Sequence, residues 1–174
     1  ELDNHWTENG GFLVAKNLLK ELKQDVYPDL DLSPLDQFTW KKEVRNFGHF
    51  TNVLATDQLS EDILLIKKSP AGIEQLENLP LEFEKHGVGE HEQQLHFRAK
   101  NCKNKLRVLV IRDSFGSALI APISACFSES VFIFDSWTYR LNKSVLASYK
   151  PDLVIYITYE QQLKAYTNPA NWGN

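Results

Sequence analysis

The spacing of apolar residues predicts a helix near the start of the chain. After Trp6, apolar side chains recur at helical spacing, at Phe12, Ala15, Leu18, Leu19 and Leu22. This spacing predicts an amphipathic helix over about residues 10–24. Thr7 or Asn9 is available as its N-cap.

The last third of the chain has a different pattern, typical of buried strands. Three short runs, Leu106–Ile111, Val131–Phe134 and Leu153–Ile157, are almost continuously apolar, as in strands buried on both faces. Helix-like segments separate them, and Pro151 ends the second of these. The order β-α-β-α-β predicts an α/β fold with a parallel sheet, right-handed crossovers and helices in layers on both faces.

The middle of the chain is less regular. Residues 25–60 contain Pro28 and Pro34, several Asp residues and a turn at Gly48-His49-Phe50. These features predict a long excursion with one short strand or helix inside. An apolar run follows within residues 61–69. Polar and apolar residues then alternate at Leu81–Phe83 and Leu95–Ala99, on either side of a Gly-Val-Gly sequence. We therefore expect a β insertion over about 61–100, with a hairpin at a sheet edge.

Composition narrows the class of protein. The 174 residues are 43% hydrophobic with a net charge of −4, which predicts one domain and argues against nucleic acid as a partner. No apolar run is long enough to span a bilayer. The chain opens at Glu1 without Met, so we expect a trimmed fragment. Cys102 and Cys126 lack the spacing of a zinc site, which leaves buried thiols or one disulfide.

The residues after the first buried run carry the first candidate chemistry. Arg112-Asp113-Ser114-Phe115-Gly116 would form a turn from strand to helix, the place where ligands bind in parallel sheets. Backbone N–H groups at such a turn can stabilise an oxyanion beside the Ser114 hydroxyl. Ser114 is therefore a candidate nucleophile. The alternative is that Asp113 or Ser114 only caps the helix.

Asp3 and His5 supply the other parts of a Ser-His-Asp triad. In an extended segment, a separation of two residues places both side chains on one face, so the Asp3 carboxylate can orient the His5 imidazole. A serine becomes nucleophilic when a histidine accepts its proton and a carboxylate fixes the histidine tautomer. The alternatives are a helix-start carboxylate and a surface histidine near the chain end.

Together these motifs resemble a known family. The D-x-H-W sequence at residues 3–6, followed by a helix, a long excursion and a strand ending in R-D-S-F-G, resembles the SGNH-hydrolase-like domain of the alginate O-acetyltransferase family and its relatives with an Asp-His-His-Trp motif. Gly48–Leu54 is similar to the family's G-D-L-x-x-M-L turn, and Pro151–Ile157 to its last core strand. The resemblance covers most of the chain. It implies a three-layer, SGNH-like (flavodoxin-like) core in which Asp and His precede Ser, a permuted order.

The resemblance also assigns roles to residues. It implies that Ser114 is the nucleophile, His5 the base and Asp3 the residue that orients it, with the backbone at Ser114 and Gly48 forming the oxyanion hole. Two positions depart from the family pattern, since His49 replaces an Asp and Arg112 stands where many members have Gly. These departures concern the oxyanion hole and the specificity for the acyl donor.

The function implied by the resemblance is O-acetylation of a polysaccharide through an acetyl-serine intermediate, without a cofactor. It further implies a periplasmic or other extracytoplasmic location, export or anchoring through a missing N-terminal segment, and an acetyl donor delivered by a membrane O-acyltransferase. Two alternatives remain open: a carbohydrate or lipid acetylesterase in which water replaces the sugar hydroxyl, and a non-catalytic polysaccharide-binding module.

Several residues after the second and third buried runs are candidates for a substrate wall: Asp135, Trp137, Tyr139, Arg140, Thr158, Tyr159 and Glu160. Aromatic rings flanked by polar groups suit the apolar faces and hydroxyls of sugars. We single out Trp137 and Tyr139, with Gly48 and Arg112, as candidates for oxyanion or substrate contacts. Core packing explains the aromatic residues equally well.

The sequence argues against a metal site and against an α/β-hydrolase site. His86, His91 and His96 recur among glutamates, but an odd separation places neighbours on opposite faces of a strand and about 140° apart on a helix. We therefore expect a solvated hairpin and no metal site. Ser114 also lacks the G-x-S-x-G sequence of α/β-hydrolases, because Arg112 occupies the first Gly position.

Overall fold

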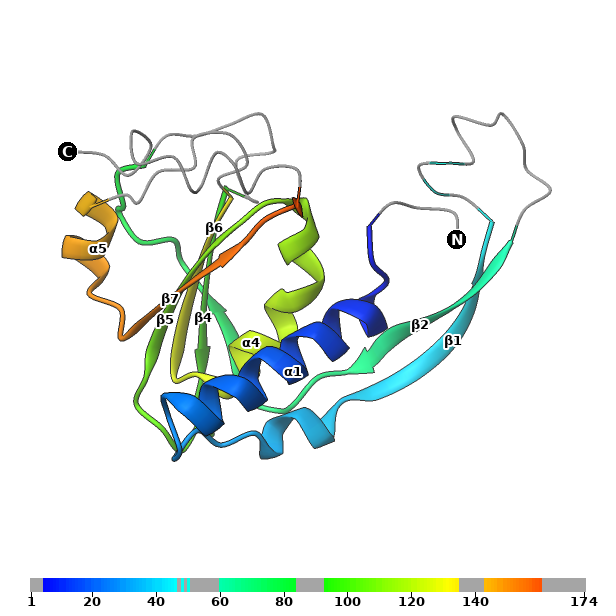
Figure 1. The fold of residues 1–174 in the computed structure, drawn as a ribbon, viewed down its shortest axis with the longest axis horizontal. Coiled ribbons are helices and arrows are strands. Elements are labelled where there is room, and N and C mark those ends of the chain that lie inside the picture. Colours follow the sequence, from blue (N-terminus) through cyan, green and yellow to red (C-terminus); the bar gives the residue numbers. More distant parts are fainter. Residues whose placement is uncertain are drawn as a thin grey trace.

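A five-stranded mixed sheet organises the computed structural model, which describes residues 5–46, 48, 50, 60–83, 93–134 and 143–160. The sheet has the strand order β3-β4-β6-β5-β7 (Figure 1). Its strands are β3 (Ile73–Leu76), β4 (Gln94–Ala99), β5 (Arg107–Arg112), β6 (Glu129–Phe134) and β7 (Leu153–Ile157).

The three strands predicted from continuous apolar runs form the centre and one edge of this sheet. β6 and β7 both pair in parallel with β5. The interior residues of β5, Val108–Ile111, are buried, because helices cover both faces of the sheet. This explains why the strand is apolar at consecutive positions rather than alternate ones. The prediction of an α/β fold is confirmed.

The sheet is not wholly parallel, because β4 pairs antiparallel with β6, and β3 antiparallel with β4. The predicted strand at 95–99 lies within β4, but its predicted partner at 81–83 was wrong. Ile73–Leu76 takes that place. Leu81 and Phe83 instead pack as irregular chain against one face of the sheet, which produces the same apolar alternation without a strand.

Helices cover the two faces of the sheet. Helix α1 (Glu8–Asp25), the short 3-10 helix η1 (Ser33–Gln37) and α4 (Ile120–Cys126) pack in one core, and α5 (Lys143–Tyr149) packs in the other. The Thr7 side chain caps α1 by accepting a hydrogen bond from the Gly10 amide. The predicted helix is thus confirmed. No helix among the described residues is long and apolar enough to cross a membrane.

A separate two-stranded antiparallel sheet, here called the arm, consists of β1 (Thr39–Arg45) and β2 (Glu61–Lys68). Figure 1 shows the arm reaching away from the main sheet. Its base is anchored on α1, because the Trp40 ring packs edge-on against Phe12 with centroids 5.1 Å apart. A Glu8 carboxylate oxygen also accepts a hydrogen bond from the Ile66 amide. The excursion over 25–60 therefore holds both η1 and a seven-residue strand.

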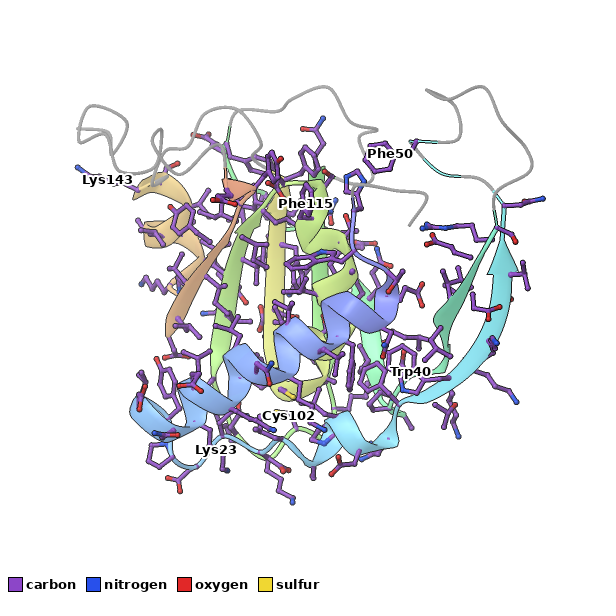
Figure 2. All side chains as sticks on the ribbon, turned by 45° about the vertical axis from the view of Figure 1, so that its right-hand side comes forward. Lys23, Trp40, Phe50, Cys102, Phe115 and Lys143 are labelled. Atoms are coloured by element: carbon purple, nitrogen blue, oxygen red, sulfur yellow. The ribbon has the colours of Figure 1, made fainter. Side chains whose placement is uncertain are left out.

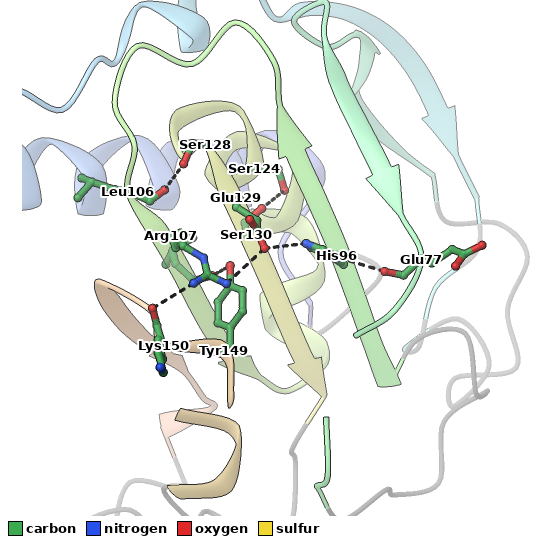
Figure 3. A network of polar contacts seen from close by, with 11 residues as sticks. Glu77, His96, Leu106, Arg107, Ser124, Ser128, Glu129, Ser130, Tyr149 and Lys150 are labelled. Carbon is green, nitrogen blue, oxygen red and sulfur yellow. Dashed lines mark hydrogen bonds and ion pairs between the residues drawn. The ribbon is translucent and has the colours of Figure 1, made fainter. Parts of the chain in front are cut away.

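A polar network lies at the end of the sheet where β5 and β6 begin (Figure 3). The buried His96 ring has Nδ1 3.0 Å from the Glu77 carbonyl oxygen and Nε2 3.0 Å from the Glu129 carboxylate. The Arg107 guanidinium lies 4.3 Å from the centre of the Tyr149 ring and 3.6 Å from the same carboxylate. The role of His96 here is structural.

His86 and His91 lie outside the described residues. Within the described part of the chain, no group of three or more His, Cys, Asp or Glu side chains could hold a metal ion.

Gly11 sets the approach of α1 to the 3-10 helix η2 (Ser114–Leu119), because a Cβ at this position would overlap the Ala118 Cβ. Alanine normally favours a helix interior over glycine by up to about 1 kcal/mol, but the overlap forces α1 away from η2. We expect Gly11→Ala to lower the free energy of unfolding by about 1–3 kcal/mol, measured by urea denaturation. Gly10→Ala is the matched control, since its Cβ would meet the Trp6 Cβ at 3.2 Å; equal losses would contradict the packing argument.

Cys102 and Cys126 are both free thiols. Burial raises the pKa of Cys102, and raises that of Cys126 to about 12. Because the thiolate is the reactive form, we expect Cys126 in the folded protein to resist a disulfide reagent at about pH 8. Both thiols should react in denaturant. Rapid modification of both thiols before unfolding would contradict the buried placement of Cys126.

Candidate active site

Ser114 and His5 meet although they are 109 positions apart in the chain. Ser114 is exposed and begins η2 immediately after β5. Its Oγ lies 2.9 Å from His5 Nε2. When the ring proton is on Nδ1, the Ser114 hydroxyl donates to Nε2, which is the arrangement in which an imidazole can accept a serine proton.

The segment before α1 is held on the turn that carries Ser114. Trp6 Nε1 donates a hydrogen bond to the Phe115 carbonyl oxygen at 2.5 Å. The ring centroids of His5 and Phe115 are 4.8 Å apart. Trp6 thus ties the D-x-H-W segment to the serine turn, and Phe115 supports the imidazole.

Asp113 connects this turn to the end of β7. Its carboxylate accepts hydrogen bonds from the Phe115 amide at 2.9 Å and from the Tyr159 amide at 2.7 Å. Its own amide donates to the Ile157 carbonyl at 3.2 Å. The side chain therefore caps η2, as one sequence interpretation proposed, and also holds Tyr159 where its ring stacks on Phe115 at a centroid distance of 5.1 Å.

Hydrogen bonds to Asp113 occupy the two amide N–H groups that follow Ser114. The Phe115 N–H is taken by the Asp113 carboxylate and the Gly116 N–H by the Asp113 carbonyl. The Ser114 amide is thus the donor in this turn that suits an oxyanion. Gly48 lies in the described chain, and Phe50, two residues later, lies on the same upper edge of the molecule as Phe115 in Figure 2. The oxyanion role of Gly48 stays a prediction.

Arg112 lies beneath the turn and is 2% exposed. Its Nη1 donates to the Asp113 carbonyl at 3.2 Å and to Ser117 Oγ at 2.9 Å, and its guanidinium lies 5.2 Å from the centre of the Phe134 ring. A Cβ on Gly116 would come within 2.6 Å of the Arg112 Cβ, so the glycine makes room for this side chain. The structure places Arg112 as an internal support of the turn.

The other predicted site residues lie outside the described part of the chain. These are Asp3, which was predicted to orient His5, the wall residues Asp135, Trp137, Tyr139 and Arg140, and His49. Their assignments stay predictions.

Two pockets flank the His5–Ser114 pair, and His5 and Trp6 line both. The larger, of about 570 Å³, is also lined by Phe115, Thr158, Tyr159 and Glu160. The smaller, of about 350 Å³, is lined by Ser114 itself and by Ser117 and Ala118. Three residues of the predicted substrate wall therefore line the larger pocket.

Sequence reasoning missed two residues of the larger pocket, Arg45 and Glu61. They lie where β1 ends and β2 begins, and pair with each other across the arm. Local sequence carries no signal for this placement, since it depends on how the arm packs on α1.

No protein-family model and no curated protein matches the chain. Solved structures do match. PatB1 of Bacillus cereus has a TM-score of 0.60 at 13% identity, over 92% of this chain and 62% of its own. A DHHW family protein from Eubacterium siraeum has a TM-score of 0.57 at 13% identity, over 90% of this chain and 57% of its own.

AlgX of Pseudomonas aeruginosa matches over 91% of this chain and 35% of its own, at 15% identity and a TM-score of 0.47. The first two likenesses show a shared fold. The family name of the Eubacterium siraeum protein, DHHW, is the Asp-His-His-Trp motif that residues 3–6 resemble. The chain spans less than two thirds of the length of each of these proteins.

The role of Asp113 in holding the turn can be tested by removing its carboxylate. The side chain is 7% exposed, so Asp113→Ala leaves two backbone donors without their acceptor. We expect a loss of about 1–3 kcal/mol in the free energy of unfolding, measured by urea denaturation. Asp62→Ala, which removes an exposed carboxylate paired with Lys42, should cost less than about 1 kcal/mol. Similar losses in the two variants would refute the role of Asp113.

Proposed function

We propose that this chain is an O-acetyltransferase that acts on a polysaccharide through an acetyl-Ser114 intermediate. The observation that carries the proposal is the 2.9 Å contact between Ser114 Oγ and His5 Nε2 at the carboxyl end of the central strand β5. A hydroxyl that is exposed, positioned by a rigid turn and bonded to an imidazole has the geometry of an activated nucleophile.

In the first half of the proposed reaction, Ser114 Oγ attacks the carbonyl carbon of the acetyl donor while His5 Nε2 takes the hydroxyl proton. The bond from the acetyl carbon to the donor's leaving group breaks, and the leaving group takes that proton from His5. In the second half, a sugar hydroxyl attacks acetyl-Ser114 and gives its proton to His5. The ester bond to Ser114 breaks, and His5 returns the proton to Ser114 Oγ.

Four further groups complete the proposed machinery. The Ser114 amide, with Gly48, stabilises the negative charge on the acetyl oxygen. Asp3 orients His5 and stabilises its protonated form, as the resemblance to the D-x-H-W family implies. Arg112 keeps the turn in place from the interior of the protein.

The fold supports this proposal. Helices lie on both faces of a sheet whose central strands are parallel, and the likeness to PatB1 and to the DHHW family protein is consistent with an SGNH-like, three-layer core. The polysaccharide acceptor, the extracytoplasmic location and delivery of acetyl groups by a membrane O-acyltransferase follow from the family resemblance and belong to the proposal.

Ser114→Ala tests the nucleophile. We expect it to abolish turnover of an activated acetyl ester such as p-nitrophenyl acetate, because the acyl intermediate needs this oxygen. His5→Ala should reduce turnover by at least about 100-fold, the usual contribution of a positioned base. Ser144→Ala, which changes an exposed serine on α5, is the matched control. Unchanged turnover in folded Ser114→Ala protein would sink the proposal.

The acceptor separates the proposed transferase from its alternatives. Product is measured as acetate released and as acetylated sugar, with and without an oligosaccharide acceptor. A transferase forms acetylated sugar, while an esterase releases acetate at the same rate with or without sugar. A binding module binds the sugar without Ser114-dependent turnover.

A further inference from the structure

The larger of the two pockets lies between the His5–Ser114 pair and the arm. Its lining combines residues from three distant parts of the chain: the segment before α1, the far end of the arm, and the residues after β7. It contains His5 but is not lined by Ser114, whereas the smaller pocket contains both. A molecule in the larger pocket therefore lies beside the proposed base and next to the turn that carries the serine.

The wall of this pocket suits a sugar ring. Trp6 and Tyr159 are 36% and 40% exposed, and Tyr159 is fixed by its stacking on Phe115 and by the bond from its amide to Asp113. Exposed rings that are already rigid lose little entropy when a ligand packs on them. Thr158 Oγ1 is buried at the same wall and has no hydrogen-bond partner within the described chain. About 570 Å³ is within the usual range of small-ligand sites.

The described residues that line the pocket include two carboxylates, Glu61 and Glu160, and one guanidinium, Arg45. The Arg45 guanidinium hydrogen-bonds a Glu61 carboxylate oxygen through Nε at 3.0 Å and through Nη2. The two side chains are only 19% and 16% exposed, so each charge is largely compensated by the other. Glu160 adds a second carboxylate.

We propose that this pocket is the acceptor subsite and that it takes a sugar without a carboxylate group. A uronate bound here would meet Glu61 and Glu160, and the only cation among the described lining residues, Arg45, is already paired with a carboxylate. Desolvating a sugar carboxylate without a new partner is unfavourable, and like charges at close range repel. The assignment of the pocket as the acceptor subsite rests on the proposed function, whereas the binding of a sugar in the pocket does not.

The proposed subsite has a direct consequence for the reaction. A hydroxyl of a sugar held by Tyr159 and Trp6 is placed near His5, which takes its proton as the hydroxyl attacks acetyl-Ser114. The smaller pocket, lined by Ser114, Ser117 and Ala118, is left for the acetyl donor. The two substrates therefore approach the serine from different sides, and the charge of the larger pocket acts on the acceptor alone.

The test compares two probes of matched length, a neutral cello-oligosaccharide and an oligogalacturonate. Binding to Ser114→Ala protein is measured by calorimetry, and transfer from p-nitrophenyl acetate by the kcat/KM of each probe with unsubstituted protein. We expect the neutral probe to be preferred. Because the repulsion is electrostatic, raising the salt concentration should reduce the preference.

Variants locate the preference in the pocket. Glu160→Gln removes one carboxylate, and Glu61→Gln removes the carboxylate that pairs with Arg45. Each variant should shift the neutral-to-acidic ratio toward the acidic probe by about threefold to fivefold. Glu74→Gln, on β3 and paired with Lys100, removes an equal charge elsewhere and should leave the ratio unchanged. Since Glu61 bonds across the arm, Glu160→Gln decides the matter if Glu61→Gln does not fold.

The outcomes separate this inference from the proposed function. A preference for the oligogalacturonate, or a ratio that is the same in Glu160→Gln, Glu74→Gln and unsubstituted protein, overturns the acceptor subsite. If no Ser114-dependent turnover is found but the binding preference and its shift in Glu160→Gln remain, the proposed transferase fails and the sugar pocket stands.

Discussion

The candidate site depends on the hydrogen bonds of one buried carboxylate. Asp113 accepts from the amides of Phe115 and Tyr159, so it fixes the turn after β5 and the chain after β7 relative to each other. The stacked rings of Phe115 and Tyr159 follow from this, and His5 and Trp6 contact Phe115 in turn. The distance between the proposed base and nucleophile is thus set by a residue that is neither.

Packing on the other side of the turn also fixes the position of Ser114. α1 approaches η2 closely because Gly11 has no side chain to keep it from Ala118, and Arg112 fills the interior beneath the turn where Gly116 leaves room. Burying an arginine is costly, and here Nη1 of the side chain binds the turn itself through the Asp113 carbonyl and Ser117 Oγ. Arg112 thereby adds a support to the serine turn.

Hydrophobic patterning predicted the elements whose burial follows a regular pattern along the chain. Helix α1 and strands β5, β6 and β7 were found because one face of the helix, both faces of β5 and β6, and one face of β7 are buried by their neighbours. The partner of β4 was wrong because Leu81 and Phe83 bury their side chains without forming a strand. The pairing of β1 with β2 was not predicted, because β1 is largely exposed and its residues show no apolar alternation.

The sequence by itself determined the candidate chemistry: a serine at a strand-to-helix turn, a histidine beside a tryptophan near the chain start, and an α/β fold. These are local properties, since caps, turns and periodicity are set by neighbouring residues. Only the tertiary structure decided that His5 reaches Ser114, that Arg112 faces inward, and that Arg45 and Glu61 join Tyr159 around one pocket. Such contacts join segments far apart in the chain, and they follow from the combined packing of helix, sheet and arm rather than from any local pattern.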